Sequence, residues 1–152
     1  MTEQHRSELA WAMHHLAVAV AALDAVVARR MGLSAGDYLA LKHLAVSEQP
    51  LGPVELGRLL GVTSGAATGL VDRLEQAGHV LRRAHPSDRR RQTVTVTPLA
   101  RQRLADAVQP LADDIDREAD SLTPEERRQV VDVLGRLTAL HRRHARQGPT
   151  PV

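Results

Sequence analysis

Residues 61–97 read GVTSGAATGLVDRLEQAGHVLRRAHPSDRRRQTVTVT, and the spacing of apolar side chains changes inside this stretch. As far as Ala77 the apolar residues recur every three or four positions, as they do on one face of a helix. After that, two β-prone segments, Val80–Arg83 and Thr93–Val96, flank the turn-forming His85–Asp88. The stretch therefore predicts a helix followed by a charged β-hairpin.

The helix in this stretch has clear signals at both ends. Thr63 is a good N-cap, and Gly78 is a typical residue for the end of a helix. Its predicted inward stripe is Ala67, Leu70, Val71, Leu74 and Ala77. Before it, Pro53 can open a short helix that Gly61 closes. Two short helices joined at Gly61-Val62 indicate a helix-turn-helix.

Longer amphipathic segments flank this motif. Residues 3–31 carry a heptad stripe of apolar residues, which predicts a long helix in need of a partner. Ser34 is expected to cap a second helix that ends near Ser47. Helical spacing returns after Pro98, with Pro110 expected to kink or loosen that helix. Thr123 to Glu126 form a capping box that opens the last helix.

Composition limits the possible classes of protein. The chain has 152 residues, 43% of them hydrophobic and 25% charged, which fits one globular domain. Aromatic residues make up only 1%, so leucine, valine and alanine must build the core. The absence of cysteine excludes disulfides, thiolate metal sites and thiol redox switches. No uninterrupted apolar run approaches the roughly 18 residues of a membrane span, so we expect a cytoplasmic protein.

The charge is unevenly distributed. The net charge is only +2, but arginines gather between Arg73 and Arg91. Because the phosphates of DNA attract such clusters, this region is where a polyanion is expected to bind. A solvated charged loop is the alternative interpretation of Arg89 to Arg91.

The order of these elements resembles the MarR family of bacterial transcriptional regulators from Leu9 to Leu140. Leu33-Ser34 followed by Tyr38 is similar to the start of that family's DNA-binding region. Gly61-Val62-Thr63 followed by Leu70 to Leu74 is similar to its recognition helix. Asp88 to Arg91, continued to Val96-Thr97, is similar to its wing signature, with valine in place of the usual leucine.

The resemblance implies a fold that is mainly α with a small β-hairpin wing. Residues 1–152 would form a single domain, with a winged helix-turn-helix DNA-binding lobe at 33–97. Residues 3–31 and 98–146 would supply dimerisation helices, and their apolar stripes also exceed what one small lobe can cover. A two-fold homodimer implies a pseudo-palindromic operator with half-sites about one helical turn apart.

Several residues are candidates for contact with double-stranded DNA. Rotation by about 100° per residue turns one face of the predicted recognition helix away from its buried stripe. We expect the hairpin tip to enter a minor groove through Arg90, with Asp88 fixing the direction of that guanidinium. The predicted DNA-binding residues are Ser64, Gly65, Thr68, Gly69, Arg73, Asp88, Arg89, Arg90 and Arg91.

Two glycines lie at the centre of the predicted reading face. Each exposed mid-helix glycine costs about 1 kcal/mol of helix stability relative to alanine. Gly65 and Gly69 would let the backbone lie close to the groove, which leaves Ser64 and Thr68 for base edges and Arg73 for a phosphate. The alternative is neutral drift on a weakly specific binder.

Other kinds of site have less support. A small-molecule effector is expected, by resemblance, to contact Trp11, His15 and Tyr38, although aromatic residues in such a chain more often fill the core. The histidine pairs lack a third ligand at metal spacing, so no metal or cofactor is predicted. Motifs for an enzyme are also missing, including a nucleophile elbow and a phosphate-binding glycine loop.

These features together predict a sequence-specific DNA-binding transcriptional regulator. A repressor that a small molecule releases from DNA is the expected form, although the sequence does not separate repression from activation. The alternative is a winged-helix protein-interaction module without specific DNA binding. Steep salt dependence of binding to duplex DNA would argue against that alternative.

Overall fold

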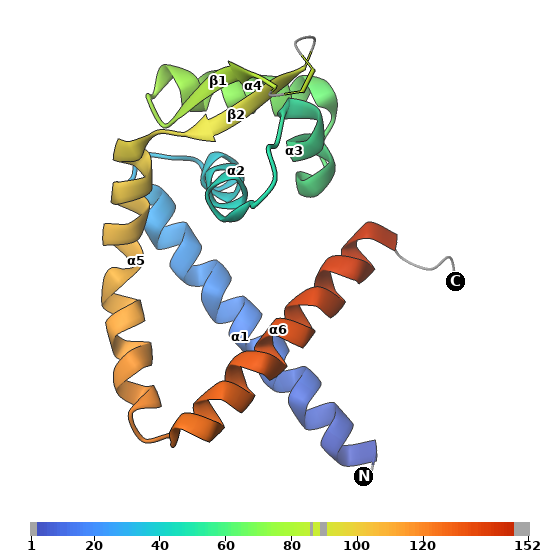
Figure 1. Ribbon diagram of the computed structural model, residues 1–152, viewed down its shortest axis with the longest axis vertical. Helices are drawn as coiled ribbons and strands as arrows, with labels where there is room; N and C mark the ends of the chain where they lie inside the picture. The colour runs from blue at the N-terminus through green and yellow to red at the C-terminus, as the bar shows by residue number, and fades with distance from the viewer. Residues whose placement is uncertain (1–2, 86, 89–90, 148–152) are drawn as a thin grey trace. The chain divides into compact units, whose positions relative to one another are not determined.

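The computed structural model describes residues 3–85, 87–88 and 91–147. Contacts divide the chain into two compact units, Met1–Ala107 and Val108–Val152. The predicted class, mainly helical with one small hairpin, is confirmed (Figure 1). The elements follow in the order α1 (Glu3–Arg30), α2 (Ala35–Val46), α3 (Pro53–Leu60), α4 (Ser64–Gln76), β1 (Val80–Ala84), β2 (Gln92–Val96), α5 (Pro98–Ala119) and α6 (Pro124–Gln147).

The helices begin and end where their capping residues predict. The Ser34 hydroxyl accepts the Asp37 amide at 3.1 Å, and the Thr63 hydroxyl accepts the Ala66 amide at 3.2 Å. Gly61 closes α3 with a positive φ of 66°, a conformation that strains residues with a Cβ. These local bonds satisfy amides and carbonyls that would otherwise lack partners, and they fix the bounds of the helix-turn-helix.

The hairpin is antiparallel, with Val80 paired to Val96 at its base. Each strand is one residue longer than the sequence predicts, because Ala84 and Gln92 continue the ladder. The Val94 amide donates to the Leu51 carbonyl at 2.7 Å. The segment before α3 therefore lies along β2, and β1 lies beside α4 (Figure 1).

The hydrophobic core belongs to the first unit, and the side chains of five helices and both strands contribute to it. As predicted, it is built almost entirely from leucine, valine and alanine, with Tyr38 as the only aromatic member. The predicted inward stripe of α4 is confirmed except at Ala77, which is exposed. The reason is that α4 ends at Gln76, so Ala77 is the C-cap and lies beyond the buried turn.

Three helices expose large apolar side chains to solvent. None of the described residues of α6 has a buried side chain, and most of α1 before Leu23 is exposed. α5 continues through Pro110 as one helix, so this proline does not end it. Exposed members of these faces include Leu9, Trp11 and Leu16 in α1, Leu111 and Ile115 in α5, and Val130, Val131 and Leu134 in α6.

One helix contains a long segment that is largely apolar. Residues Glu8–Arg30 of α1 are long and apolar enough to cross a membrane by length and composition alone. The polar His14, His15 and Asp24 interrupt this segment, so it is not an uninterrupted apolar run. Helices of soluble proteins pass the same test, and α1 buries Val27 in the core near its end.

Candidate nucleic-acid interface

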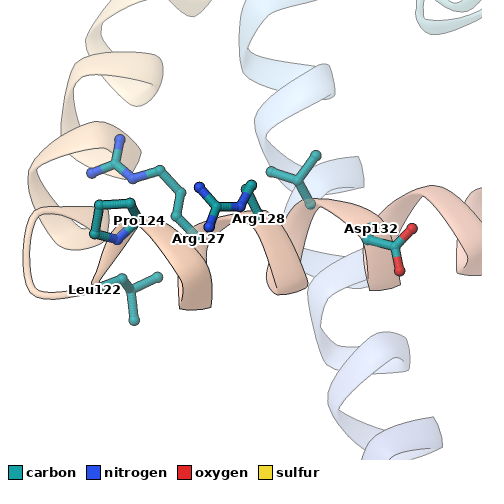
Figure 2. A pocket seen from close by; sticks show the side chains of 6 residues that line it. Leu122, Pro124, Arg127, Arg128 and Asp132 are labelled. Carbon is teal, nitrogen blue, oxygen red and sulfur yellow. The ribbon is translucent and has the colours of Figure 1, made fainter.

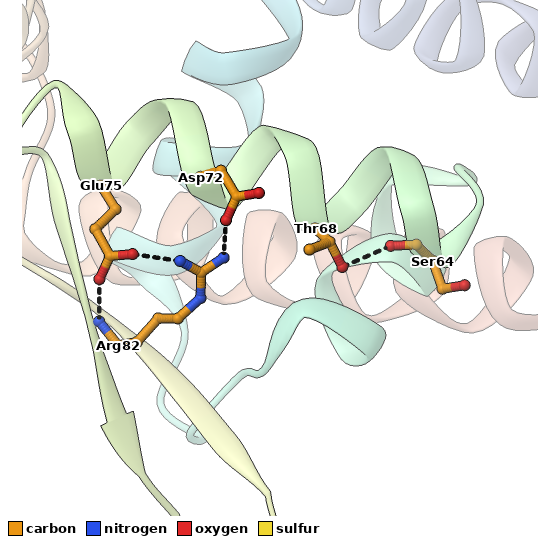
Figure 3. A network of polar contacts seen from close by, with 5 residues as sticks. All are labelled: Ser64, Thr68, Asp72, Glu75 and Arg82. Carbon is orange, nitrogen blue, oxygen red and sulfur yellow. Dashed lines mark hydrogen bonds and ion pairs between the residues drawn. The ribbon is translucent and has the colours of Figure 1, made fainter.

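The two faces of α4 differ sharply in exposure. Ala67, Val71 and Leu74 are fully buried, and this packing directs the opposite side of the helix to solvent. That side includes the predicted contacts Ser64, Gly65 and Thr68, while Gly69 is half-buried. The Thr68 hydroxyl donates to the Ser64 carbonyl at 2.9 Å (Figure 3), so its proton is engaged and its lone pairs remain available to accept.

Neither glycine of α4 is required by packing within the chain. A Cβ added at Gly65 would meet no atom within 4 Å. A Cβ at Gly69 would lie 3.8 Å from Nη1 of Arg73, an ordinary van der Waals distance. The described fold therefore tolerates alanine at both positions. No contact within it compensates for the helix stability that the two glycines cost relative to alanine.

Arg73 joins α4 to α2 through an ion pair with Asp37. Its Nη2 donates to Oδ1 of Asp37 at 2.7 Å, and its Nε lies 3.2 and 3.3 Å from the two carboxylate oxygens. Burial raises the pKa of Asp37, but hydrogen bonds from Arg73 and Ser34 outweigh burial and hold that pKa below its usual value. The Arg73 side chain is still 59% exposed, so it can reach a phosphate while Asp37 fixes its plane.

Arg82 of β1 joins the hairpin to α4. Its guanidinium pairs with both Asp72 and Glu75, and its amide donates to Glu75 at 3.2 Å (Figure 3). Asp72 lies on the exposed side of α4, where its charge alone would repel DNA. The pairing with Arg82 offsets that charge and ties the base of the hairpin to the helix.

The far end of the hairpin is described in part. The Arg91 side chain pairs with Glu55 of α3, and its amide donates to the carbonyl of the exposed Asp88 at 3.0 Å. Arg89 and Arg90 lie outside the described residues. The insertion of Arg90 into a groove, and its orientation by Asp88, therefore stay predictions.

Comparison with known proteins matches this part of the molecule to a family. The model of the MarR family matches residues 33–91, which span the start of α2 to the hairpin. Over this segment the chain is similar to the MarR family. The solved structure of the transcriptional regulator Tm0710 from Thermotoga maritima is similar to this chain, with a TM-score of 0.65 and 26% sequence identity, over 90% of this chain and 96% of that one.

Two Bacillus subtilis proteins are similar in sequence to this chain. The uncharacterized HTH-type transcriptional regulator YcgE is 39% identical over 64 residues, which are 42% of each chain. The HTH-type transcriptional repressor YetL is 32% identical over 107 residues, or 70% of this chain and 64% of YetL. The chain thus matches less than two thirds of either relative's length.

Thr97, which closes the stretch that resembles a MarR wing signature, has a structural role in this chain. The Thr97 hydroxyl donates to the Gly78 carbonyl at 2.9 Å and accepts the Ala100 amide at 3.2 Å. One side chain therefore caps α5 and ties it to Gly78, which follows the C-cap of α4. Val96, in the usual leucine position, is buried beside it.

The three predicted effector contacts do not line one described pocket. Trp11 is 60% exposed and contacts the rings of His14 and His15, whereas Tyr38 is buried in the core. Burial, followed by the charge of Asp24, raises the pKa of Tyr38. A pocket of about 670 Å³ lies instead in the second unit (Figure 2), lined by Leu122, Pro124, Arg127, Arg128, Val131 and Asp132.

Sequence reasoning missed the carboxylates that hold the arginines. Neither Asp37 nor Glu55 is among the site residues that the sequence predicts. Each lies 36 positions before its arginine, so no helical or strand spacing connects them. Among the described residues, no group of three or more histidine, aspartate or glutamate side chains could hold a metal ion.

Proposed function

We propose that this protein is a sequence-specific double-stranded DNA-binding transcriptional regulator, and more narrowly a repressor. Its main support is that the exposed side of α4 and the arginine-bearing hairpin lie together in the segment that matches the MarR family model. The name of the relative YetL supports repression over activation. We propose the cytoplasm as the location of the protein, because a bacterial transcriptional regulator must reach the DNA in that compartment.

In the proposed mode of binding, α4 lies in the major groove and the hairpin enters the minor groove. Ser64 and Thr68 contact base edges, and Gly65 and Gly69 allow the helix backbone to lie close to the DNA. Arg73, held by Asp37, contacts a phosphate. Arg89 and Arg90 are proposed as the minor-groove contacts, with Asp88 orienting Arg90.

We also propose that the protein acts as a homodimer. Apolar side chains on α1, α5 and α6 remain exposed in the single chain, and a second copy would remove them from water. A two-fold dimer presents two copies of α4 to successive major grooves about 34 Å apart. The operator is therefore proposed to be pseudo-palindromic.

A small-molecule effector that releases the DNA is the least supported part of the proposal. The exposed ring cluster of Trp11, His14 and His15 is a surface on which a planar ligand could stack. Because Tyr38 is buried, contact between an effector and its ring requires movement in the core.

Selection of bound sequences from a random duplex pool tests the function. The expected result is an enriched pseudo-palindrome, bound by two chains, with affinity that falls steeply as salt rises. An unselected duplex of equal length is the control for non-specific binding. The absence of enrichment, together with a flat salt dependence, would favour a protein-interaction module instead.

A further inference from the structure

Glu55 of α3 holds two partners from different parts of the first unit. Its Oε2 accepts the Gly52 amide at 3.0 Å and so caps α3, while its Oε1 accepts a hydrogen bond from Arg91. Backbone amides, its own first and then that of Gly52, act with the charge of Arg91 to lower the pKa of Glu55, although burial opposes them. The carboxylate is therefore charged at neutral pH and links α3 to the hairpin.

The backbone brings the same two elements into close contact. The Val94 amide of β2 donates to the Leu51 carbonyl, one residue before Gly52. A Cβ added at Gly52 would lie only 2.5 Å from the Gln92 carbonyl oxygen. The start of α3 and the start of β2 are therefore packed as tightly as their backbones allow.

Arg91 is placed to control the direction of the hairpin end. Its carbonyl accepts the His85 amide and its amide donates to the Asp88 carbonyl, both at 3.0 Å. The backbone of Arg91 thus closes the loop of the hairpin. Its side chain, bonded to Glu55, ties that closure to α3.

We propose that Glu55 and Arg91 form a latch that fixes the wing against α3, and that Arg91 is a positioning residue rather than a DNA contact. The proposal rests on the proposed DNA-binding function. It changes the expectation from sequence, in which Arg91 was one of the residues that contact DNA. Arg89 and Arg90 keep that expected role.

The latch and a direct contact predict opposite signs for one substitution. If Arg91 contacts a phosphate, Glu55 competes with the DNA, and removal of its charge strengthens binding. If the pair positions the wing, removal of that charge weakens binding, even though the protein becomes more positive. The sign of the change therefore decides between the two roles.

The experiment compares Glu55→Gln, Arg91→Gln and their double variant in binding to the selected duplex. Glutamine can still cap α3, because its amide oxygen accepts the Gly52 amide, so mainly the ion pair is lost. Glu48→Gln is the matched control, since Glu48 is exposed in the same unit and makes no ion pair with another described residue. We expect Glu55→Gln to weaken binding about threefold, the size of one partly exposed ion pair. The double variant should bind like Arg91→Gln alone.

Tighter binding by Glu55→Gln, or additive effects of opposite sign in the double variant, would overturn the latch. A second measurement, amide hydrogen exchange at Val94, needs no DNA. The Val94 amide donates to the Leu51 carbonyl, and the latch should protect this hydrogen bond from opening. Exchange should be faster in Glu55→Gln and unchanged in Glu48→Gln. If the wild type fails to bind any duplex, the proposed function fails, and unchanged Val94 exchange would separately refute the latch.

Discussion

The recognition helix α4 and the wing are held in place by different forces. α4 is fixed by apolar side chains that are almost wholly buried, with Leu74 and Val71 at 0% exposure. The wing also has buried valines, Val80, Val94 and Val96, but its attachment to α3 and α4 includes exposed or half-buried ion pairs made by Arg82 and Arg91. A buried leucine contributes about 2 kcal/mol, whereas a partly exposed ion pair contributes up to about 1 kcal/mol.

This difference separates the two parts of DNA recognition. A helix that is fixed by the core presents the same face to DNA whatever the salt concentration. A wing that is oriented by charge pairs is sensitive to salt and to single charge substitutions. We therefore expect core substitutions to change folding stability first, and charge substitutions in the wing to change DNA affinity first.

Leu74→Ala should give the largest effect, because it removes a fully buried side chain from the stripe that holds α4. We expect a loss of about 2–5 kcal/mol in the free energy of unfolding, measured by urea denaturation. Leu81→Ala in β1 is the control, since Leu81 is 44% exposed and its loss should cost under about 1 kcal/mol. Equal losses for the two variants would contradict the distinction between helix and wing.

Gly52→Ala tests the contact between α3 and the wing. The new Cβ would lie 2.5 Å from the Gln92 carbonyl oxygen, and a backbone atom cannot rotate away. The φ of −98° is allowed for alanine, so steric overlap alone should cost about 1–3 kcal/mol. Thermal denaturation measures the loss. Gly36→Ala meets no atom within 4 Å, so a similar loss in that control would refute the steric explanation.

The sequence predicts local features well because they depend on neighbouring residues. Thr63, Gly61 and the Thr123–Glu126 capping box act within four positions, and the structure contains each of them. The pairs Asp37–Arg73 and Glu55–Arg91 could not be predicted from the sequence, because their helices and strands come together only when the chain folds. Arginines in the basic cluster could thus be listed from sequence, but not divided between DNA contacts and wing supports.

Gly65→Ala separates the two explanations of the glycines on the α4 reading face. Because an added Cβ meets nothing, alanine should stabilise the free protein, by less than the roughly 1 kcal/mol of a helix interior, since Gly65 is the second residue of α4. If the backbone approaches the groove closely, the same methyl group should weaken operator binding. Gly36→Ala makes an equally open substitution at the second residue of α2 and should leave that affinity unchanged. Unchanged operator affinity in Gly65→Ala would favour neutral drift.

His79 lies at the joint between α4 and the wing, and it should give the smallest effect. Its side chain is buried, and burial together with the charge of Arg103 lowers the pKa of His79. The unfolded chain binds this proton more readily, so stability should fall as the pH drops below about 6.5 and level off once the folded state is also protonated. His79→Gln should flatten the dependence of the urea midpoint on pH between about pH 7.5 and 5.5, while exposed His141→Gln should not.

The backbone of His79 also connects the two parts, because its carbonyl accepts the Thr97 amide at 2.9 Å. Protonation of His79 in the folded state should therefore loosen helix and wing together. Faster amide exchange in α4 alone would show that the joint does not couple them.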